Sequence, residues 1–204
     1  KIRKDVEFHN GKTLDAHDVV ASIQHHRGEK SQSPAKSLLE PITNIKADDK
    51  HTVIVELENG NADLPYILSD YHVAMKPIVD GELEVDTGIG TGPYMLKEFE
   101  PGVRIAFERN PNYFKSGRAH FDSVEIIAAI DAAARTNALT TGEVDVIDRV
   151  DLKTVNLMKR RPGIRVEEVV GFRHYTFAMR TDTPPFDDNN VRMALKLALD
   201  RQEV

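Results

Sequence analysis

The chain has 204 residues, of which 40% are hydrophobic and 29% charged, with 27 Lys and Arg, 33 Asp and Glu and a formal net charge of -6. This is the composition of a globular protein, and the acidic balance with scattered basic residues argues against nucleic-acid binding. The sequence has no cysteine, which excludes disulfides, iron–sulfur clusters, zinc–thiolate sites and cysteine nucleophiles, and no apolar stretch approaches the roughly 20 residues of a membrane helix.

The first 89 residues predict a mixture of strands and short helices. Ile2, Val6 and Phe8 alternate as in a strand, which an Asn-Gly turn ends. Apolar residues then recur at the spacing of an amphipathic helix, with Asp15 as its N-cap and its end near Gly28. A hairpin at 45–47 and 52–57, a short helix at 64–68 and a loop at 76–89 follow.

The middle of the chain predicts a second hairpin and then a different architecture. Strands at 94–99 and 103–108 flank a Pro-Gly turn. A strand at 123–127, a helix capped by Asp131 and closed by Gly142, and a strand at 144–147 predict a βαβ unit with a parallel sheet. Further elements are a helix with Leu152, Val155 and Met158 on one face, strands at 164–170 and 175–179, and a helix from Asn189 after a break at 183–186.

The glycine-rich segment 88–92 superficially resembles a phosphate-binding loop. Such loops open onto a helix whose N-terminus receives the phosphate, whereas Pro93 leads here into a strand. We therefore interpret the segment as a turn that needs positive φ or close packing.

The first helix carries polar residues that imitate two kinds of site. Asp18, Ser22 and His25 share a face at the spacing of a triad, but the amides around a mid-helix serine are committed to the helix, so we interpret this face as solvated. His17 and His25 lie about 12 Å apart along a helix axis, too far to share one zinc ion. No metal site is expected on this helix.

Two groups of residues remain as candidates for ligand contact. The carboxylates Glu143, Asp145, Asp148 and Asp151 lie near a predicted strand end, where sheet proteins often bind ligands, and Asp151 is more simply a helix cap. The last predicted strand alternates aromatic and hydrogen-bonding residues. Its aromatic residues face the core in one interpretation, and its opposite face, with His174, lines a cleft in the other.

Four sequence segments occur in a characteristic order. They are Phe-His-Asn-Gly-Lys at 8–12 with Asp-Ala-His-Asp-Val-Val-Ala-Ser at 15–22, Gly-Thr-Gly-Pro-Tyr at 90–94, Arg-Asn-Pro-Asn-Tyr-Phe at 109–114, and Pro-Pro-Phe-Asp-Asp at 184–188 with Val-Arg-Met-Ala-Leu at 191–195 and Ala-Leu-Asp-Arg at 198–201. Together they resemble the dipeptide and oligopeptide binding-protein family of ABC importers, which is extracellular solute-binding protein family 5. The resemblance covers essentially the whole chain, with His17 where an acid is usual and Arg180 where an asparagine is usual.

The resemblance implies a mixed α/β fold of the type II periplasmic-binding-protein kind, with two lobes that close on a ligand. Residues 1–89 would form a smaller α+β subdomain of the first lobe, residues 90–180 its mixed-sheet core with the βαβ unit, and residues 181–204 the hinge and first helix of the second lobe. Both ends of the chain look cut, so we expect it to be a piece of a longer protein, without most of the second lobe.

The resemblance also implies transport without chemistry. The expected function is the substrate-binding component of an ABC importer, a monomer without cofactor or metal that captures di- or oligopeptides or similar small solutes. It would do so in the periplasm, or on a membrane anchor where the organism lacks an outer membrane, and deliver them to a permease. The expected cleft residues are Phe172, Arg173, His174, Tyr175 and Asp148.

Two alternatives stay open at this point. The first is a hydrolase that uses the carboxylates between Glu143 and Asp151. The second is a nickel or metal-chelate carrier of the same family, which the eight histidines suggest.

Overall fold

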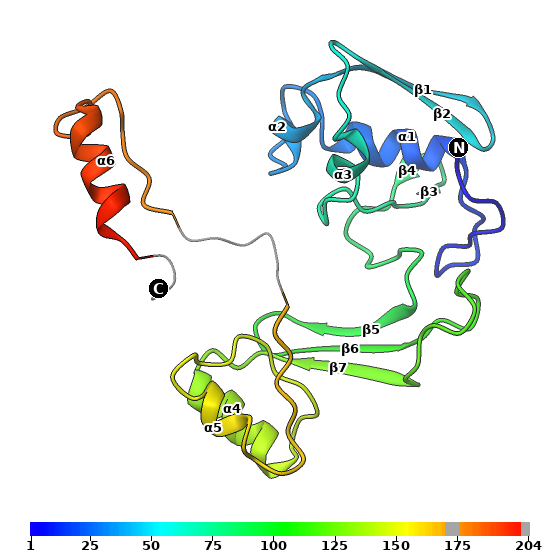
Figure 1. Ribbon diagram of the computed structural model, residues 1–204. Coiled ribbons are helices and arrows are strands. Elements are labelled where there is room, and N and C mark those ends of the chain that lie inside the picture. The colour runs from blue at the N-terminus through cyan, green and yellow to red at the C-terminus, as the bar shows by residue number, and fades with distance from the viewer. Residues whose placement is uncertain (170–175, 201–204) are drawn as a thin grey trace. The chain divides into compact units, whose positions relative to one another are not determined.

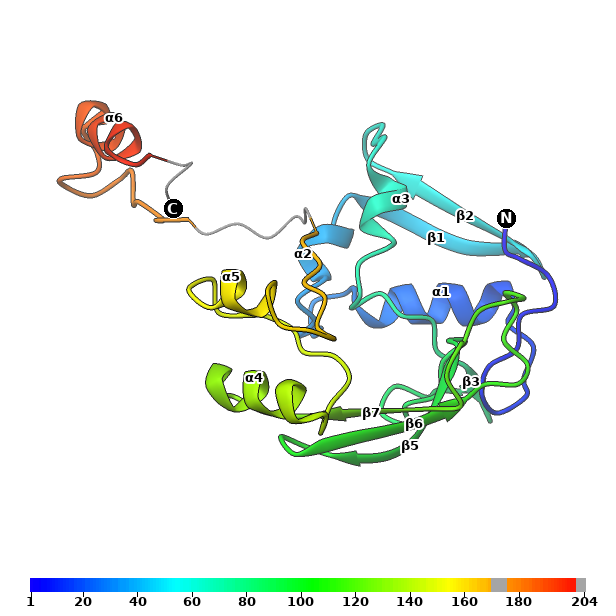
Figure 2. The ribbon, with the colours of Figure 1, turned by 60° about the horizontal axis from the view of Figure 1, so that its bottom comes forward.

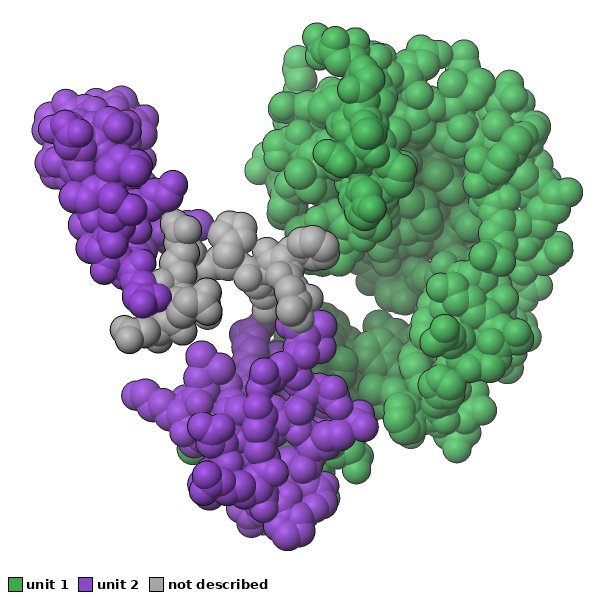
Figure 3. Space-filling view, viewed as in Figure 1, with its two compact units in different colours: residues 1–145 green, residues 146–204 purple. Residues whose placement is uncertain are grey.

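The computed structural model describes residues 1–169 and 176–200. The chain divides into two compact units, residues 1–145 and 146–204 (Figures 1 and 3). The first unit contains helices α1 to α4 and every described strand, and the second contains α5 and α6. In the described part of the chain, none of the helices is both long enough and apolar enough to cross a membrane.

Helix α1 (Ala16–His25) is the central element of the N-terminal part of the first unit. The expected N-cap is present as part of a capping box: the Asp15 carboxylate accepts from the amides of His17 and Asp18, and the Asp18 carboxylate accepts from the Asp15 amide at 3.0 Å. The apolar side chains of Ala16 and Ile23 are buried as the helical spacing predicts. The helix ends at His25, slightly before the expected end near Gly28.

The hairpin of β1 (Ile42–Asp49) and β2 (Thr52–Leu57) lies along α1 (Figure 2) and confirms the first predicted hairpin. Helix α2 (Lys36–Leu39) and the expected short helix α3 (Leu64–Ile67) flank it. Because their apolar side chains meet those of α1, a continuous core forms. Its buried members are Ile23, Ala35, Leu39, Ile42, Ile45 and Val73.

Two N-terminal expectations need correction. No strand forms at residues 2–8, where only an isolated bridge joins Glu7 to Thr13, because the turn at Gly11 reverses the chain almost at once. Val6 and Phe8 are nevertheless buried, with Leu14, in a second small core. The expected loop at 76–89 contains a short hairpin of β3 (Ile78–Val79) and β4 (Glu82–Leu83).

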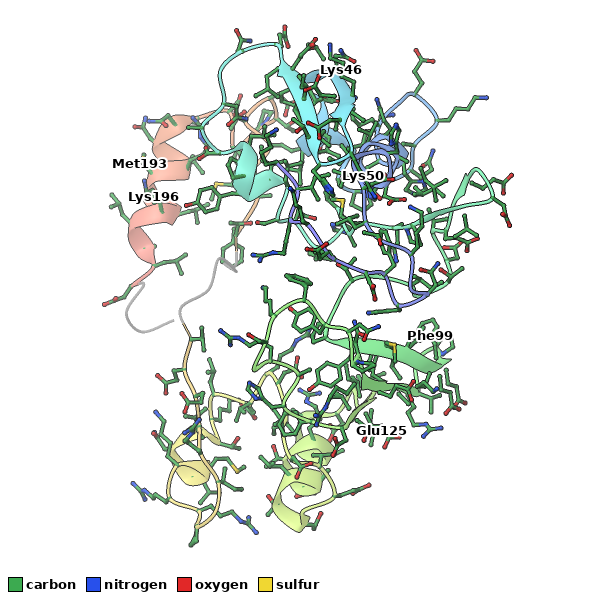
Figure 4. All side chains as sticks on the ribbon, turned by 90° about the vertical axis from the view of Figure 1, so that its right-hand side faces the viewer. Lys46, Lys50, Phe99, Glu125, Met193 and Lys196 are labelled. Atoms are coloured by element: carbon green, nitrogen blue, oxygen red, sulfur yellow. The ribbon has the colours of Figure 1, made fainter. Side chains whose placement is uncertain are left out.

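A three-stranded antiparallel sheet in the order β5-β6-β7 confirms the second predicted hairpin and the strand that follows it. Its strands are β5 (Tyr94–Glu100), β6 (Arg104–Arg109) and β7 (Ser123–Ile127). The register gives it one apolar and one charged face, marked by Phe99 and Glu125 in Figure 4. The apolar face carries Leu96, Phe99, Ile105, Phe107, Val124 and Ile126, and the charged face carries Glu98, Arg104, Glu108 and Glu125.

Helix α4 (Ala132–Thr141) forms as predicted, with the Asp131 carboxylate accepting from the Ala134 amide at 2.7 Å and Gly142 left-handed at the C-cap. The expected strand at 144–147 does not form, so the βαβ unit is absent from the described residues, in which every strand pair is antiparallel. The physical reason lies at the helix end, because the amides of Glu143 and Val144 both donate to the Ala138 carbonyl instead of to a neighbouring strand.

The second unit departs further from the prediction. Helix α5 (Val155–Met158) is a single turn that buries Met158 but leaves Leu152 exposed, and residues 164–169 and 176–179 form no strand. Asp151 is not the helix cap, because its carboxylate accepts from the Lys153 amide within a turn that precedes the helix. Helix α6 (Asn189–Ala198) begins where predicted.

Candidate functional site

Of the five residues expected to line a ligand cleft, the described part of the chain includes Asp148 alone. Phe172, Arg173, His174 and Tyr175 lie outside the described residues. The Asp148 side chain is exposed, and its Oδ2 lies 3.3 Å from Nε of Arg149, the next residue. The described residues therefore do not test whether the predicted cleft residues lie together, and their role stays a prediction.

The carboxylates considered for acid–base chemistry form no site in the described residues. Glu143 and Asp145 are exposed in the first unit, and Asp148 and Asp151 are exposed in the second. Among residues 1–169 and 176–200, no three histidine, aspartate or glutamate side chains gather so that they could hold a metal ion. The arrangement gives the hydrolase alternative no support.

The polar face of α1 is buried at two of its three residues, which corrects the interpretation of Asp18 and Ser22 as solvated. Both side chains are almost inaccessible to solvent, whereas His25 is exposed. The Ser22 hydroxyl donates to the Asp18 carbonyl at 2.7 Å and accepts from the Lys76 amide at 2.8 Å. This serine is a structural link between the helix and residue 76 and is not a nucleophile.

Among the described residues, Asp18 is the one charged side chain that is buried in the core, and its carboxylate is well hydrogen-bonded. It accepts from Nζ of Lys12 at 2.6 Å, from the Asp15 amide and, at 2.9 Å, from the Ile78 amide. A buried carboxylate needs such compensation because burial removes its hydration. Asp18 thus joins the Asn-Gly turn, the start of α1 and the β3–β4 hairpin.

Three of the four sequence segments that carry the family resemblance meet in the structure. The His9 amide donates to the Gly90 carbonyl at 2.9 Å, the Gly90 amide donates to Nδ1 of His9 at 3.3 Å, and Nε2 of His9 lies 3.0 Å from the Gly92 carbonyl. The Gly92 carbonyl also accepts from Nδ2 of Asn110 at 3.0 Å. We call these four residues the His9 junction.

The junction continues into the third segment. Asn110 is buried, its amide donates to the Pro93 carbonyl at 2.9 Å, and its Oδ1 accepts from the Asn112 amide at the same distance. Nδ2 of Asn112 donates to the Glu7 carboxylate at 3.1 Å. The sequence predicts these segments only as separate turns. Their contact could have been anticipated from one feature, because each segment contains a turn residue next to a side chain that both donates and accepts hydrogen bonds.

The glycine-rich turn has the structural role expected for it. Gly88 has a φ of 72°, and a Cβ there would lie 2.4 Å from Cδ2 of Leu96, so the position needs both a positive φ and close packing. Residues after the turn enter β5 and not a helix. The phosphate-loop interpretation is thereby excluded for this segment.

An open depression of about 700 Å³ lies beyond the C-terminus of α1, lined by His25, Arg27 and residues 28–33. Near this end of the helix, Nδ1 of His26 pairs with the Ser33 hydroxyl at 2.7 Å. Burial, and then the positive charges of His25 and His72, lower the pKa of His26. The depression is lined mainly by one loop, and no group of three metal-ligating side chains gathers there among the described residues.

Comparison with known proteins shows which family this chain resembles. The family model described as bacterial extracellular solute-binding proteins, family 5 Middle, matches residues 1–204. The chain is 27% identical to the "Probable di/tripeptide-binding protein 5" of Pseudomonas aeruginosa, over 98% of this chain and 43% of that protein. It is also 27% identical to the oligopeptide-binding protein AppA of Bacillus subtilis, over 100% of this chain and 39% of that protein.

The solved structure of a nickel ABC transporter protein from Bacillus halodurans matches with a TM-score of 0.72 and 30% identity, covering 100% of this chain and 42% of that one. The likeness confirms the expected type II periplasmic-binding-protein fold. The chain spans about two-fifths of the length of the curated relatives it matches. It belongs to family 5 of the bacterial extracellular solute-binding proteins.

Proposed function

We propose that the complete protein is the substrate-binding component of an ABC importer that captures di- or oligopeptides, or similar small solutes, and delivers them to a membrane permease. The observation that carries this proposal is the family match over the whole chain. The names of two relatives add the solute class, because one is called a di/tripeptide-binding and the other an oligopeptide-binding protein. The protein would act as a monomer outside the cytoplasmic membrane, without catalysis.

In this proposal the first lobe comprises the subdomain of residues 1–89 and the sheet-containing part of residues 90–180, and residues 181–204 enter the second lobe. The two lobes would close about the hinge on the bound ligand. Phe172, Arg173, His174, Tyr175 and Asp148 would line the cleft, where a few polar groups give specificity and aromatic side chains exclude water.

Binding and turnover can be tested together. The complete protein, purified without a histidine tag, should bind dipeptides or oligopeptides in calorimetry, and mass spectrometry should recover the peptide unchanged. Cleavage of the peptide would support a carboxylate hydrolase and contradict the proposal. Failure to bind any of a broad set of peptides would contradict the solute class.

The proposed cleft residues have a separate test. Tyr175→Ala should weaken peptide binding by about tenfold or more, which corresponds to ~1.4 kcal/mol, without lowering the melting temperature. Tyr66→Ala is the matched control, because Tyr66 is 75% exposed on α3 and should leave affinity unchanged. Equal affinities for the two variants would remove Tyr175 from the cleft while leaving the transport function intact.

A metal chelate is the second candidate cargo, because the Bacillus halodurans relative is described as a nickel ABC transporter protein. Metal analysis of the tag-free complete protein decides between the two. Stoichiometric nickel with no peptide affinity would favour the metal carrier.

The 204-residue chain alone should show no thermal shift with a dipeptide if a second lobe supplies one wall of the cleft.

A further inference from the structure

His9 is the one side chain of the His9 junction that touches the glycine-rich turn at two points. Its Nδ1 lies 3.3 Å from the Gly90 amide nitrogen, and its Nε2 lies 3.0 Å from the Gly92 carbonyl oxygen. Its own amide donates to the Gly90 carbonyl at 2.9 Å. The ring and its backbone therefore clamp residues 90–92, which lead directly into β5.

The partners of the ring determine its protonation. A backbone amide can only donate and a carbonyl can only accept, so Nδ1 must offer a lone pair to Gly90 while Nε2 carries a hydrogen for Gly92. Only the neutral imidazole with its proton on Nε2 satisfies both contacts. A second proton on Nδ1 would place two donors against each other and remove the bond to Gly90.

The neighbouring contacts give His9 a positioning role in the junction. The Gly92 carbonyl has two lone pairs, and Nε2 of His9 and Nδ2 of Asn110 use both. Asn110 is buried and tied to the Pro93 carbonyl, so it holds the same turn from the side of β6. If the ring of His9 loses its hydrogen bonds, the turn stays attached to the sheet through Asn110, but the ring no longer holds it to the N-terminal segment.

The charged side chains of the segments that meet here have contacts of their own. On the N-terminal side, Glu7 accepts from Asn112 and Lys12 pairs with Asp18. On the sheet side, Arg109 pairs with Asp122, and Lys115 and Arg3 lie over the ring of Phe114. Asp86 carries the charge that precedes the glycine-rich turn along the chain. His9 is thus the side chain of the junction whose hydrogen-bonding pattern a second ring proton would change.

We propose that His9 is a positioning residue that fastens the glycine-rich turn to the N-terminal segment only while its ring is neutral, so that acid loosens this link within the first lobe. The contribution of the link is present while Nδ1 of His9 carries no proton and is lost when the ring takes up a second proton. A consequence for solute affinity rests on the proposed function, but the loosening itself does not.

Hydrogen exchange and ring NMR of the complete protein test the proposal. Nitrogen NMR of labelled histidine should show His9 protonated on Nε2 at neutral pH. The protection factor of the Gly90 amide should fall roughly three- to tenfold between about pH 8 and about pH 5, the loss expected for one hydrogen bond. Proton occupancy of Nδ1 at neutral pH would overturn the proposal.

Three variants separate positioning from mere structure. His9→Gln keeps one acceptor and one donor but does not titrate, so Gly90 should stay protected at both pH values. His9→Ala should lose the protection at both. His26→Gln, which removes a different titrating ring, should behave like the wild type. The same pH dependence in the wild type and in His9→Gln would show that His9 is not the sensor.

Peptide affinity is measured separately from the hydrogen exchange of the Gly90 amide. If the proposed function holds, peptide affinity should fall more steeply toward acid in the wild type than in His9→Gln. Absence of peptide binding at every pH would count against the proposed function, and the Gly90 protection factors would still decide the role of His9.

Discussion

Helices α1 and α6 are closely matched in local design and opposite in packing. Each has ten residues, and each is preceded by an N-cap aspartate whose carboxylate accepts from a backbone amide of the first turn. Yet α1 buries Ala16 and Ile23 in the core, whereas α6 buries no residue and leaves Leu195 and Leu197 exposed. Met193 and Lys196 of α6 are labelled in Figure 4.

The difference shows which part of helix formation is local. A cap and an apolar stripe determine where a helix begins and which side would be buried, and both helices have them. Stability comes mainly from the surface against which the stripe packs. The first unit supplies such a surface for α1, in the β1–β2 hairpin and residues 76–78, whereas the described residues of the second unit supply none for α6. Substitutions at matched positions should therefore have unequal effects.

The largest effect should come from Asp18, the buried charge of α1. Asp18→Ala removes the shared acceptor of Lys12 Nζ and of the Asp15 and Ile78 amides, and leaves those donors without it. Breaking such a buried pair costs about 3–5 kcal/mol. Urea denaturation of the 204-residue chain, followed by circular dichroism, measures the loss.

Lys196 is the matched charge on α6, where the described residues include no ion pair of its ammonium group. Lys196→Ala should change the free energy of unfolding by less than about 0.5 kcal/mol. A cost for Asp18→Ala no greater than that for Lys196→Ala would show that the hydrogen bonds of Asp18 contribute little, and the contrast between the helices would fail.

The next effect compares two leucines. Leu39 is fully buried against α1, and Leu39→Ala should cost about 2–5 kcal/mol because it leaves a cavity in a closed core. Leu195 on α6 is 44% exposed, and Leu195→Ala should stay within about 0.5 kcal/mol in the same denaturation experiment. A comparable loss at Leu195 would mean that α6 packs against something in this chain after all.

Local signals allowed the prediction of the elements but not of their partners. The Asp15 and Asp131 caps, the Gly142 C-cap and the antiparallel hairpins depend on residues within a few positions of each other, and all are confirmed. The strand predicted at 144–147 was wrong although three of its four residues are β-branched, because the amides of Glu143 and Val144 donate to the end of helix α4. Propensity does not reveal such competition for donors.

The polar residues were harder to predict because their partners are distant in the sequence. Asp18 and Ser22 lie on the expected face of α1, but their burial depends on residues 76 and 78, more than fifty positions away. His9, which lies far before Gly92 in the sequence, and Asn110, which lies after it, both contact the Gly92 carbonyl. The residues expected to line the cleft fall mostly outside the described residues, so that part of the site stays a prediction.

The smallest effect on stability should come from the N-cap residues of α1 and α6, and for α1 it should depend on pH. Burial by itself would raise the pKa of Asp15, but the hydrogen bonds from the amides of Asp18 and His17 outweigh it and lower the pKa below its ordinary value of 3.8. A carboxylate whose pKa is lowered on folding adds stability above the unfolded pKa, and this stability is lost as the pH falls through the folded value. Asp15→Ala should therefore cost about 1 kcal/mol at neutral pH and less in acid, whereas Asp15→Asn keeps an acceptor and should cost little at neutral pH.

Asp188→Ala makes the same change at the cap of α6, where the side chain accepts from the Asn190 amide at 2.8 Å. Since α6 buries no residue, the lost cap should reduce the helical circular dichroism signal of the chain slightly and leave the main unfolding midpoint unchanged. Asp15→Ala should instead shift that midpoint, because α1 unfolds together with the core that it covers. Equal midpoint shifts for the two alanine variants would show that α6 belongs to the same cooperative unit as α1, and that packing does not distinguish the two helices.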